Sequence, residues 1–337
     1  MTGRLIAPPP RPANAWRRPP TFSVVIPVFQ AADTVGRAIE SALDQTVPPL
    51  EVIVCDDGST DDIVDAIAPY GKDVTFLRQE NMGPAVARNR AVESASGQII
   101  AFLDADDAFL PGRLAALRSV ALARPDLDII TTDAYIEVDG EFVGRVYGER
   151  QAFPTEGQRT AIVLSNFIFT QTAVHREWLL RVPFDRLVPP GVEDWLCWIG
   201  LILRGASAGL LLEPLSVYAV RGGSLSASQA RILRNSLSLY ERVKLDPALR
   251  ADEREVVAAA VARDHRELAV AELRDALLDA RSGARQHALA VACGRGFGGR
   301  RRMRAAAAAV APAVARHLVH RRRSRRDWRL SQWDVRS

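Results

Sequence analysis

Residues 99–107 are Ile-Ile-Ala-Phe-Leu-Asp-Ala-Asp-Asp, a short apolar run followed at once by three carboxylates. A run of this length is typical of a buried strand. Residues 52–59, Val-Ile-Val-Cys-Asp-Asp-Gly-Ser, show the same pattern earlier in the chain. Two acidic clusters therefore each follow an expected strand, and their relation in space depends on how those strands run.

Segments with the pattern of buried strands alternate with segments of helical periodicity in this part of the chain. We expect strands at 22–26, 50–55, 74–77 and 99–103. Helices are expected between them, with Asp33 and Ser59 as caps and Pro84 in a first turn. The alternation predicts right-handed βαβ units and a mostly parallel sheet, whose ligands bind beyond the carboxyl ends of the strands.

The sheet is expected to become mixed further along the chain. Asp139-Gly140 separates two strand-like runs, which is a strong signal for a hairpin. Further strands are expected at Phe167–Val174 and Leu210–Val220, with a helix at Glu193–Leu203 between them. The fold class predicted is α/β, a mixed and mostly parallel sheet flanked by helices and followed by a C-terminal helical region.

The composition is that of a globular protein. Of 337 residues, 48% are hydrophobic and 25% charged, which excludes a mainly disordered or fibrous chain. Three widely separated cysteines and the lack of a His-Glu-x-x-His pair argue against a disulfide framework and a zinc hydrolase. We expect a disordered leader at 1–21, an α/β domain at 22–230, a helical accessory region at 231–294 and an arginine-rich tail at 295–337.

The arginine-rich tail has three interpretations: an interfacial segment on anionic lipid, a nucleic-acid-binding arm, or a solvated disordered end. The apolar stretch 305–319, flanked by arginines, favours a membrane surface. No aromatic-interleaved motif supports nucleic acid. No apolar run reaches the roughly 20 residues of a bilayer span, and no signal peptide is recognisable. We therefore expect a cytoplasmic protein that is soluble or peripheral on the cytoplasmic face of the membrane.

Both acidic clusters are expected at one edge of the sheet, because parallel strands end there together. Carboxylates held close repel each other unless a cation binds. Mn²⁺ or Mg²⁺ suits such a site, since these ions take carboxylate oxygens, waters and substrate phosphates. Each cluster taken singly is also explained as a polar turn with a helix cap, and their combination favours the binding site.

Four motifs in sequence order carry a resemblance to a known family. They are Phe22–Phe29, Val54–Asp61, Asn81–Asn89 and Phe102–Asp107. In these motifs, in Glu193-Asp194-Trp195 and in segments 213–218 and 223–226, the sequence is similar to the family 2 inverting glycosyltransferases. The resemblance covers about residues 22–228. It implies the GT-A fold and a nucleotide-sugar donor.

The resemblance implies a nucleotide site made by five matched residues. Pro27 and Phe29 would line the nucleobase pocket, and Asp56 and Asp57 would bond the base and the ribose. Arg88 would lie near the phosphates or brace the site.

It also implies the catalytic and metal-binding groups. Asp104 and Asp106 form the family's Asp-x-Asp pair, in which Asp106 would bind the metal and Asp104 would face the ribose or a metal-bound water. Asp107 is a further ligand candidate. In the pair Glu193-Asp194, Asp194 would be the general base that takes a proton from an acceptor hydroxyl.

Two departures from the family pattern bear on the reaction. Arg221 stands where many relatives have a histidine, so it would contact the diphosphate directly in place of a histidine ligand. The Gln-x-x-Arg-Trp motif of processive synthases is absent. The expected reaction is thus non-processive transfer from a nucleoside-diphosphate sugar, with UDP as the favoured nucleotide, to a hydroxyl of a glycan or lipid-linked acceptor.

Other functions fit the sequence less well. A catalytically degenerate scaffold that acts as a binding or interaction protein remains the alternative, because fold alone does not decide activity. A nucleotidyltransferase is disfavoured because the loop after the first strand, residues 28–32, has neither glycine nor lysine. A dehydrogenase is disfavoured because no Gly-x-Gly-x-x-Gly opens the first helix.

Overall fold

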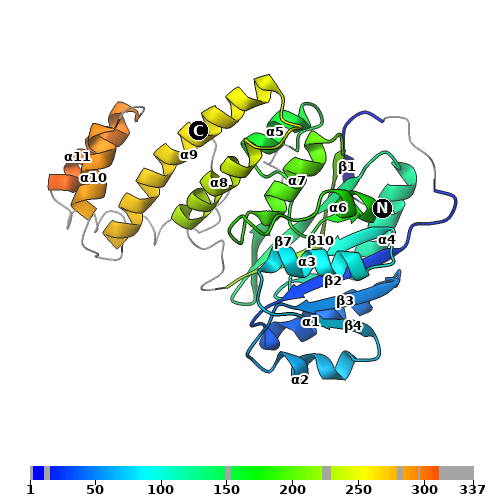
Figure 1. Ribbon diagram of the computed structural model, residues 1–337. Helices are drawn as coiled ribbons and strands as arrows, with labels where there is room; N and C mark the ends of the chain where they lie inside the picture. Colours follow the sequence, from blue (N-terminus) through cyan, green and yellow to red (C-terminus); the bar gives the residue numbers. More distant parts are fainter. Residues whose placement is uncertain are drawn as a thin grey trace. The chain divides into compact units, whose positions relative to one another are not determined.

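The computed structural model describes residues 3–10, 16–148, 153–221, 229–278, 284–294 and 297–310. The chain divides into two compact units. Unit 1 consists of Met1–Arg221 and Asp246–Glu253, and unit 2 of Gly222–Leu245 and Arg254–Ser337. In Figure 1 the sheet and its helices run from blue to green, and the helices of unit 2 from yellow to orange.

The helices and strands follow each other as Figure 1 labels them. The strands are β1 (Arg4–Ile6), β2 (Phe22–Val28), β3 (Glu51–Asp56), β4 (Val74–Arg78), β5 (Ile99–Phe102), β6 (Ala108–Phe109), β7 (Ile129–Val138), β8 (Glu141–Arg145), β9 (Ala173–His175) and β10 (Ala208–Val220). The helices are α1 (Ala32–Leu43), α2 (Ile63–Ile67), α3 (Pro84–Ser94), α4 (Arg113–Ala123), α5 (Gln158–Leu164), α6 (Arg176–Arg181), α7 (Glu193–Leu203), α8 (Gln229–Val243), α9 (Ala251–Leu278), α10 (Ala284–Cys293) and α11 (Gly299–Val310). A 3₁₀ turn, η1 (Ala68–Tyr70), follows α2.

The strands of the described residues form one sheet, ordered β1-β10-β7-β9-β5-β2-β3-β4, with β6 paired to β10 and β8 to β7. Strands β4, β3, β2 and β5 pair in parallel, as do β7 and β10. Strand β9 lies between the two groups and is antiparallel to both β5 and β7. The two groups therefore point the same way, which confirms the mixed, mostly parallel sheet.

Hydrophobic side chains cover both faces of this sheet. On one face, Val24 and Ile26 of β2 pack in a cluster with the apolar stripe of α1, which includes Val35 and Ile39. On the other face, Phe102 of β5 makes ring contacts with Phe184 and Trp198. The period-two alternation of a strand thus separates two cores, and the polar ends of the strands are left for the site.

Most of the expected elements are confirmed, including the hairpin at Asp139-Gly140, where β7 and β8 pair. The strand expected at Phe167–Val174 is wrong over most of its length, because only its end belongs to β9. Two backbone N–H groups before β9 donate to side chains instead of to a neighbouring strand. The Ile168 N–H donates to Asn166 Oδ1, and the Phe169 N–H donates to the Tyr147 hydroxyl oxygen. With these donors bonded elsewhere, the ladder starts later.

The disordered leader expected at 1–21 is wrong for part of its length. Arg4–Ile6 form β1, which pairs antiparallel with Leu210–Leu212 of β10. The Gly3 N–H donates to Glu213 Oε2 at 2.9 Å, and the Trp16 indole N–H donates to the Ala121 carbonyl at 3.1 Å. Because this segment is rich in proline and arginine, the sequence alone did not indicate these few contacts.

The predicted boundaries after the sheet also differ from the structure. The division at 230/231 falls inside α8, and residues 246–253 belong to unit 1. Two ion pairs hold this segment there: Arg204 with Asp246 at 2.8 Å, and Arg159 with Glu253 at 2.6 Å. Within unit 2, α11 packs on α10, so the division expected at 294/295 does not separate a tail from the helices.

Helix α11 contains the start of the apolar stretch 305–319 that was expected at a membrane surface. Its residues Ala305, Ala308 and Ala309 are buried in a cluster within unit 2, so they do not form the expected membrane face. The rest of the stretch and of the arginine-rich tail, from residue 311, lies outside the described range, and its membrane role stays a prediction. Within the described residues, no helix combines the length and apolar character that a bilayer crossing requires.

Candidate active site

Four strands bring predicted site residues to the same edge of the sheet. Phe29 follows β2, Asp57 follows β3, Asp104 follows β5 and Arg221 follows β10, and these strands run in one direction. Strand β2 pairs with both β3 and β5, which confirms that the two acidic clusters share this edge. The Phe29 side chain is 49% exposed there, so its ring is free to meet a ligand.

Asp56 is fully buried and shapes the turn after β3. Its Oδ1 accepts the Ser59 N–H at 2.9 Å, and its Oδ2 lies 3.2 Å from Arg78 Nε in an ion pair. The turn needs glycine at Gly58, where φ is 77° and a Cβ atom would lie 2.7 Å from the backbone nitrogen of Asn81. The Asp-Gly-Ser sequence is thus explained by turn geometry, and the predicted contact of Asp56 with a base or ribose stays a prediction.

Asp57 ties the same turn to the loop before α3. Its Oδ1 accepts the Gln79 side-chain N–H at 2.8 Å and the Met82 backbone N–H at 2.9 Å, and its Oδ2 accepts the Gly83 N–H at 2.8 Å. A carboxylate has about four acceptor positions. Asp57 uses three of them on the protein, so its predicted role toward the nucleotide stays a prediction.

Arg88 joins the two acidic regions of the site. From α3, its Nη2 donates to Asp104 Oδ1 at 2.8 Å and its Nη1 donates to Glu193 Oε1 at 2.6 Å. The Arg88 side chain is only 6% exposed and lies against the Phe184 ring. The second oxygen of Glu193 accepts the Gly191 N–H at 2.5 Å. Each oxygen of Glu193 therefore accepts a bond within the protein, and its predicted catalytic role stays a prediction. Arg88 sets the spacing between the acids after β5 and those of α7.

Asp194 is buried beside Glu193 at the start of α7. Its Oδ2 accepts the Thr170 hydroxyl at 2.7 Å, and its Oδ1 accepts the Trp195 N–H at 2.6 Å. Burial, and next the charge of Glu193, raise the pKa of Asp194 to about 6, while the bond from Thr170 and the charge of Arg88 lower it. A carboxyl with a pKa near the working pH is suited to accept a proton.

Asp104 and Asp106 are both half-buried after β5. Burial raises the pKa of Asp106, the neighbouring Asp104 raises it further, and Arg221 at the end of β10 lowers it. The two carboxylates are thus close enough to repel each other, a cost that a bound cation offsets.

Two positioning residues, Thr170 and Gln171, are not among those predicted from the sequence. Thr170 holds Asp194, and the Gln171 side-chain amide donates to Asp107 Oδ2. The other oxygen of Asp107 accepts the Ala219 N–H at 2.8 Å. Asp107 is therefore committed to the fold by both oxygens. One feature of the sequence could have identified them: residues 170–172 are polar, although they lie inside a run expected to be a buried strand.

Replacing Thr170 by valine is expected to shift the pH dependence of activity. If Asp194 is the base, kcat/KM rises with pH through about 6, because only the ionised carboxylate accepts a proton. Loss of a hydrogen bond to a charged group, worth about 1.5–3 kcal/mol, moves the midpoint upward by roughly one to two pH units. Thr172→Val is the matched control, since the Thr172 hydroxyl donates to the Ile130 carbonyl and not to Asp194. Equal midpoints in the two variants would contradict the assignment.

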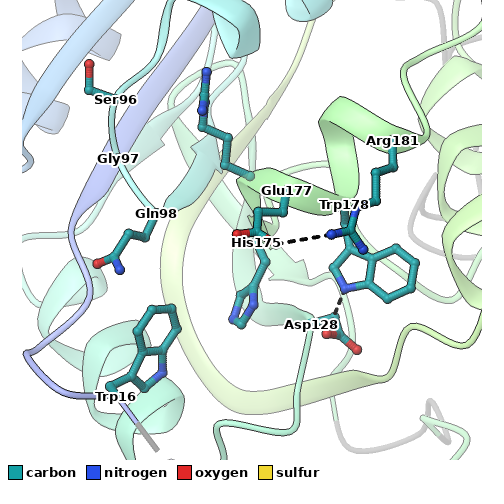
Figure 2. A pocket seen from close by; sticks show the side chains of 10 residues that line it. Trp16, Ser96, Gly97, Gln98, Asp128, His175, Glu177, Trp178 and Arg181 are labelled. Atoms are coloured by element: carbon teal, nitrogen blue, oxygen red, sulfur yellow. Dashed lines mark hydrogen bonds and ion pairs between the residues drawn. The ribbon is translucent and has the colours of Figure 1, made fainter. Parts of the chain in front are cut away.

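A hollow lies at the edge of the sheet opposite to the acidic residues, next to the starts of β5 and β7 (Figure 2). Its cavity of about 360 Å³ is lined by residues that include Trp16, Asp128, His175 and Trp178. Asp128 is held there by the Trp178 indole N–H at 2.8 Å. No predicted site residue lines this hollow, so it is separate from the acidic edge.

The sequence model of glycosyl transferase family 2 matches residues 23–182, which include the sheet edge and the acidic residues after β3 and β5. This part of the chain belongs to that family. The chain is 38% identical over 148 residues to the uncharacterized glycosyltransferase YibD of Escherichia coli, a match that covers 43% of this chain and 41% of YibD. The chain thus spans less than half of the length of this relative.

Two further relatives match over more of their length. The chain is 27% identical over 237 residues to the putative teichuronic acid biosynthesis glycosyltransferase TuaG of Bacillus subtilis, covering 68% of this chain and 90% of TuaG. It is 29% identical over 215 residues to the UDP-Glc:alpha-D-GlcNAc-diphosphoundecaprenol beta-1,3-glucosyltransferase WfaP of Escherichia coli, covering 63% and 82%.

Solved structures support the GT-A fold. TarS 1-349 of S. aureus in complex with UDP aligns with a TM-score of 0.56 at 16% identity, covering 91% of this chain and 93% of TarS 1-349. The mannosyltransferase PcManGT of Pyrobaculum calidifontis, in complex with GDP-Man and Mn²⁺, aligns with a TM-score of 0.58 at 19% identity, covering 97% and 92%. At these identities the likeness is one of fold.

Proposed function

We propose that the transferase moves a sugar from a nucleoside-diphosphate sugar to a hydroxyl of a glycan or lipid-linked acceptor, by a single inverting displacement that needs Mn²⁺ or Mg²⁺. The observation that carries the proposal is the buried bridge of Arg88 between Asp104 and Glu193. This bridge links Asp104, which is expected at the donor, to Glu193. Glu193 is the neighbour of Asp194, the carboxylate expected to activate the acceptor.

The residues proposed to bind the nucleotide-sugar donor are chosen by the exposure of their side chains and by their charge. Phe29 offers an exposed ring for the base next to Pro27, and Arg221 adds a positive charge beside Asp106 for the diphosphate. UDP is the favoured nucleotide, since WfaP is named for a UDP-glucose donor and TarS is seen with UDP.

The residues present fit a divalent ion with few protein ligands. Asp104 keeps an oxygen that is not bonded to Arg88, and repulsion between Asp104 and Asp106 favours a cation. Asp107 is left out of the ligand set, because it is 1% exposed and each of its oxygens already accepts a protein hydrogen bond. Mg²⁺-type sites commonly use one or two carboxylates together with substrate phosphates. When bound, the ion neutralises charge on the diphosphate leaving group.

The chemistry at the acceptor rests on Asp194. Its carboxylate accepts the proton of the acceptor hydroxyl while that oxygen forms a bond to the anomeric carbon. The bond from that carbon to the diphosphate breaks, and its electron pair leaves with the nucleoside diphosphate. Attack from the face opposite the leaving group inverts the anomeric configuration. Thr170 and the Trp195 N–H hold the carboxylate in place during the transfer.

The acceptor is assigned to cell-envelope or polysaccharide assembly on the printed names of TuaG and WfaP. WfaP acts on a diphosphoundecaprenol-linked sugar, which favours a lipid-linked acceptor here. The lack of a Gln-x-x-Arg-Trp motif favours addition of one sugar per encounter.

Calorimetric titration with UDP, GDP and dTDP, each with and without Mn²⁺, tests the donor assignment. We expect one nucleotide to bind in the presence of Mn²⁺, and Asp106→Asn to weaken that binding at least about tenfold, which corresponds to about 1.4 kcal/mol. Asp65→Asn is the matched control, because it removes one exposed carboxylate on α2 that is not among the residues proposed to bind the nucleotide or the metal.

Two outcomes would contradict the proposal. If no nucleotide binds the folded protein with or without Mn²⁺, the degenerate scaffold becomes the better interpretation. If Asp106→Asn binds as tightly as Asp65→Asn, the nucleotide does not depend on a metal held by the acids after β5.

A further inference from the structure

Arg113, the first residue of α4, is a charged side chain that the fold buries completely. Its exposed fraction is 0%, and burial lowers the pKa of its guanidinium. No carboxylate in the described part of the chain forms an ion pair with it, and the helix dipole disfavours a cation in a first turn. Because a buried charge is costly unless it is bonded, the partners of Arg113 indicate what keeps it there.

The guanidinium of Arg113 donates to oxygens on three separate segments. Its Nη1 donates to the Thr132 hydroxyl of β7 and, at 3.4 Å, to the Ser216 hydroxyl of β10. Its Nη2 donates to the backbone carbonyl of Gln171. The central carbon of the guanidinium lies 4.5 Å from the centre of the Phe109 ring. The planar fork is therefore fixed in one orientation, with one arm on Gln171.

Gln171 is the middle residue of a tight turn just before β9. The Thr172 N–H donates to the Thr170 carbonyl, two residues back, at 2.8 Å. A bond of this span closes a three-residue γ-turn. Gln171 is fully buried, so its carbonyl needs a partner within the protein, and Arg113 supplies it.

The side chains of the same turn hold two buried carboxylates of the site. The Thr170 hydroxyl donates to Asp194 Oδ2 at 2.7 Å, and the Gln171 amide donates to Asp107 Oδ2. One turn thus connects the carboxylate expected to act as base with the acidic cluster after β5. A shift of this turn would move both hydrogen-bond donors together.

The charge of Arg113 does not act on Asp194 directly. Burial and four neighbouring groups shift the pKa of Asp194, and these groups are Glu193, Thr170, Arg88 and the Trp195 N–H. Arg113 is not among them. Any influence of Arg113 on Asp194 therefore passes through the turn.

We propose that Arg113 is a positioning residue of the site, which holds the turn 170–172 through the Gln171 carbonyl and thereby sets where Thr170 holds Asp194. Its consequence for the reaction rests on the proposed sugar transfer, in which Asp194 is the base. If Arg113 served packing alone, an apolar side chain of similar volume would leave Asp194 unchanged.

Carbon-13 NMR of the full chain, labelled at the aspartate carboxyl carbons, tests the proposal without a substrate. Asp194→Asn identifies the Asp194 signal, and its pH titration gives the pKa. In Arg113→Met we expect this pKa to rise, because a loosened turn weakens the hydrogen bond from Thr170 to the ionised carboxylate. The rise should not exceed the roughly one to two pH units expected for Thr170→Val.

A double variant shows whether the effect passes through the turn. Arg113→Met with Thr170→Val should titrate as Thr170→Val does, because without the hydroxyl the turn has no bond to Asp194 left to weaken. Arg118→Met is the matched control, since Arg118 lies on the same helix and makes no bond to residues 170–172 among the described groups. Its Asp194 pKa should equal that of wild type.

Arg113→Lys guards against misfolding, which urea unfolding detects. Lysine keeps the charge and one donor for the Gln171 carbonyl but lacks the fork, so we expect a smaller rise of the Asp194 pKa. Three outcomes would overturn the proposal. They are a wild-type pKa in every Arg113 variant that folds, an equal rise in Arg118→Met, and a double variant that exceeds Thr170→Val.

The pH midpoint of kcat/KM separates this proposal from the proposed function. If the Asp194 pKa rises in Arg113→Met but the midpoint does not follow it, the positioning role stands and Asp194 is not the base. If Thr170→Val raises both the pKa and the midpoint while Arg113→Met raises neither, the positioning role fails and the proposed base stands.

Discussion

Asp194→Asn is expected to lower kcat by about a hundredfold to ten-thousandfold, the usual contribution of a positioned general base. Asparagine keeps the size of the side chain: its oxygen can still accept the Trp195 N–H and its amide N–H can donate to the Thr170 hydroxyl oxygen, but it does not take up a proton. Donor binding in the calorimeter should stay unchanged, because Asp194 lies on the acceptor side of the Arg88 bridge in the proposed mechanism.

The same variant is expected to be more stable than wild type at pH 8. The folded pKa of about 6 lies above the ordinary 3.8, so between about pH 4 and 6 the folded protein binds more protons than the unfolded chain. Stability from this residue is therefore greatest at low pH and falls as pH rises to 6. Removing the buried charge should raise the unfolding free energy at pH 8 by up to about 3 kcal/mol, measured by urea unfolding. For the kcat prediction, an Asp194→Asn variant with near wild-type kcat would show that another group is the base.

Arg88→Met is expected to have the largest effect on stability, a loss of about 3–5 kcal/mol of unfolding free energy. Arg88 balances Glu193, whose side chain is 6% exposed, and Asp104, whose side chain is 28% exposed. Methionine fills much of the same space and removes the charge, so Glu193 is left as a buried, uncompensated carboxylate. Urea unfolding at pH 8 measures the loss.

Two companion variants isolate the cause. Arg90→Met, on the same helix, removes an arginine that is exposed and donates only to the Arg78 carbonyl among described groups, so it should cost less than about 1 kcal/mol. Arg88→Met with Glu193→Gln should recover part of the loss, because the buried charge is gone. If Arg88→Met costs no more than Arg90→Met, the bridge does not organise the site.

Local patterns predicted the elements that depend on near neighbours. Pro84, which suits a first turn, predicted the helix that the structure shows as α3, and Asp139-Gly140 predicted the hairpin. Both acidic clusters were predicted at one edge because they follow parallel strands, and the pairing of β2 with β3 and β5 confirms it. Periodicity and turn chemistry act within a few residues, so they are visible in the sequence.

Interactions between distant residues were not visible in the same way. The sequence offered Asp107 as a further metal-ligand candidate, but it did not indicate that the oxygens of Asp107 accept bonds from Gln171 and Ala219, 64 and 112 residues away. β1 in the expected leader depends on β10 and was missed for the same reason.

The sequence alone therefore determined the order of strands and helices, the family and the acids at the sheet edge. The tertiary structure decided which of those acids are bonded within the protein, how Arg88 sets Asp104 beside Glu193 across 105 residues of chain, and that the alanines of α11 face inward. The physical reason is that burial and hydrogen bonding between segments far apart depend on packing, and packing raises or lowers the cost of each charge according to its surroundings. A local pattern places a carboxylate on a loop, but only the packed neighbours determine what it can bind.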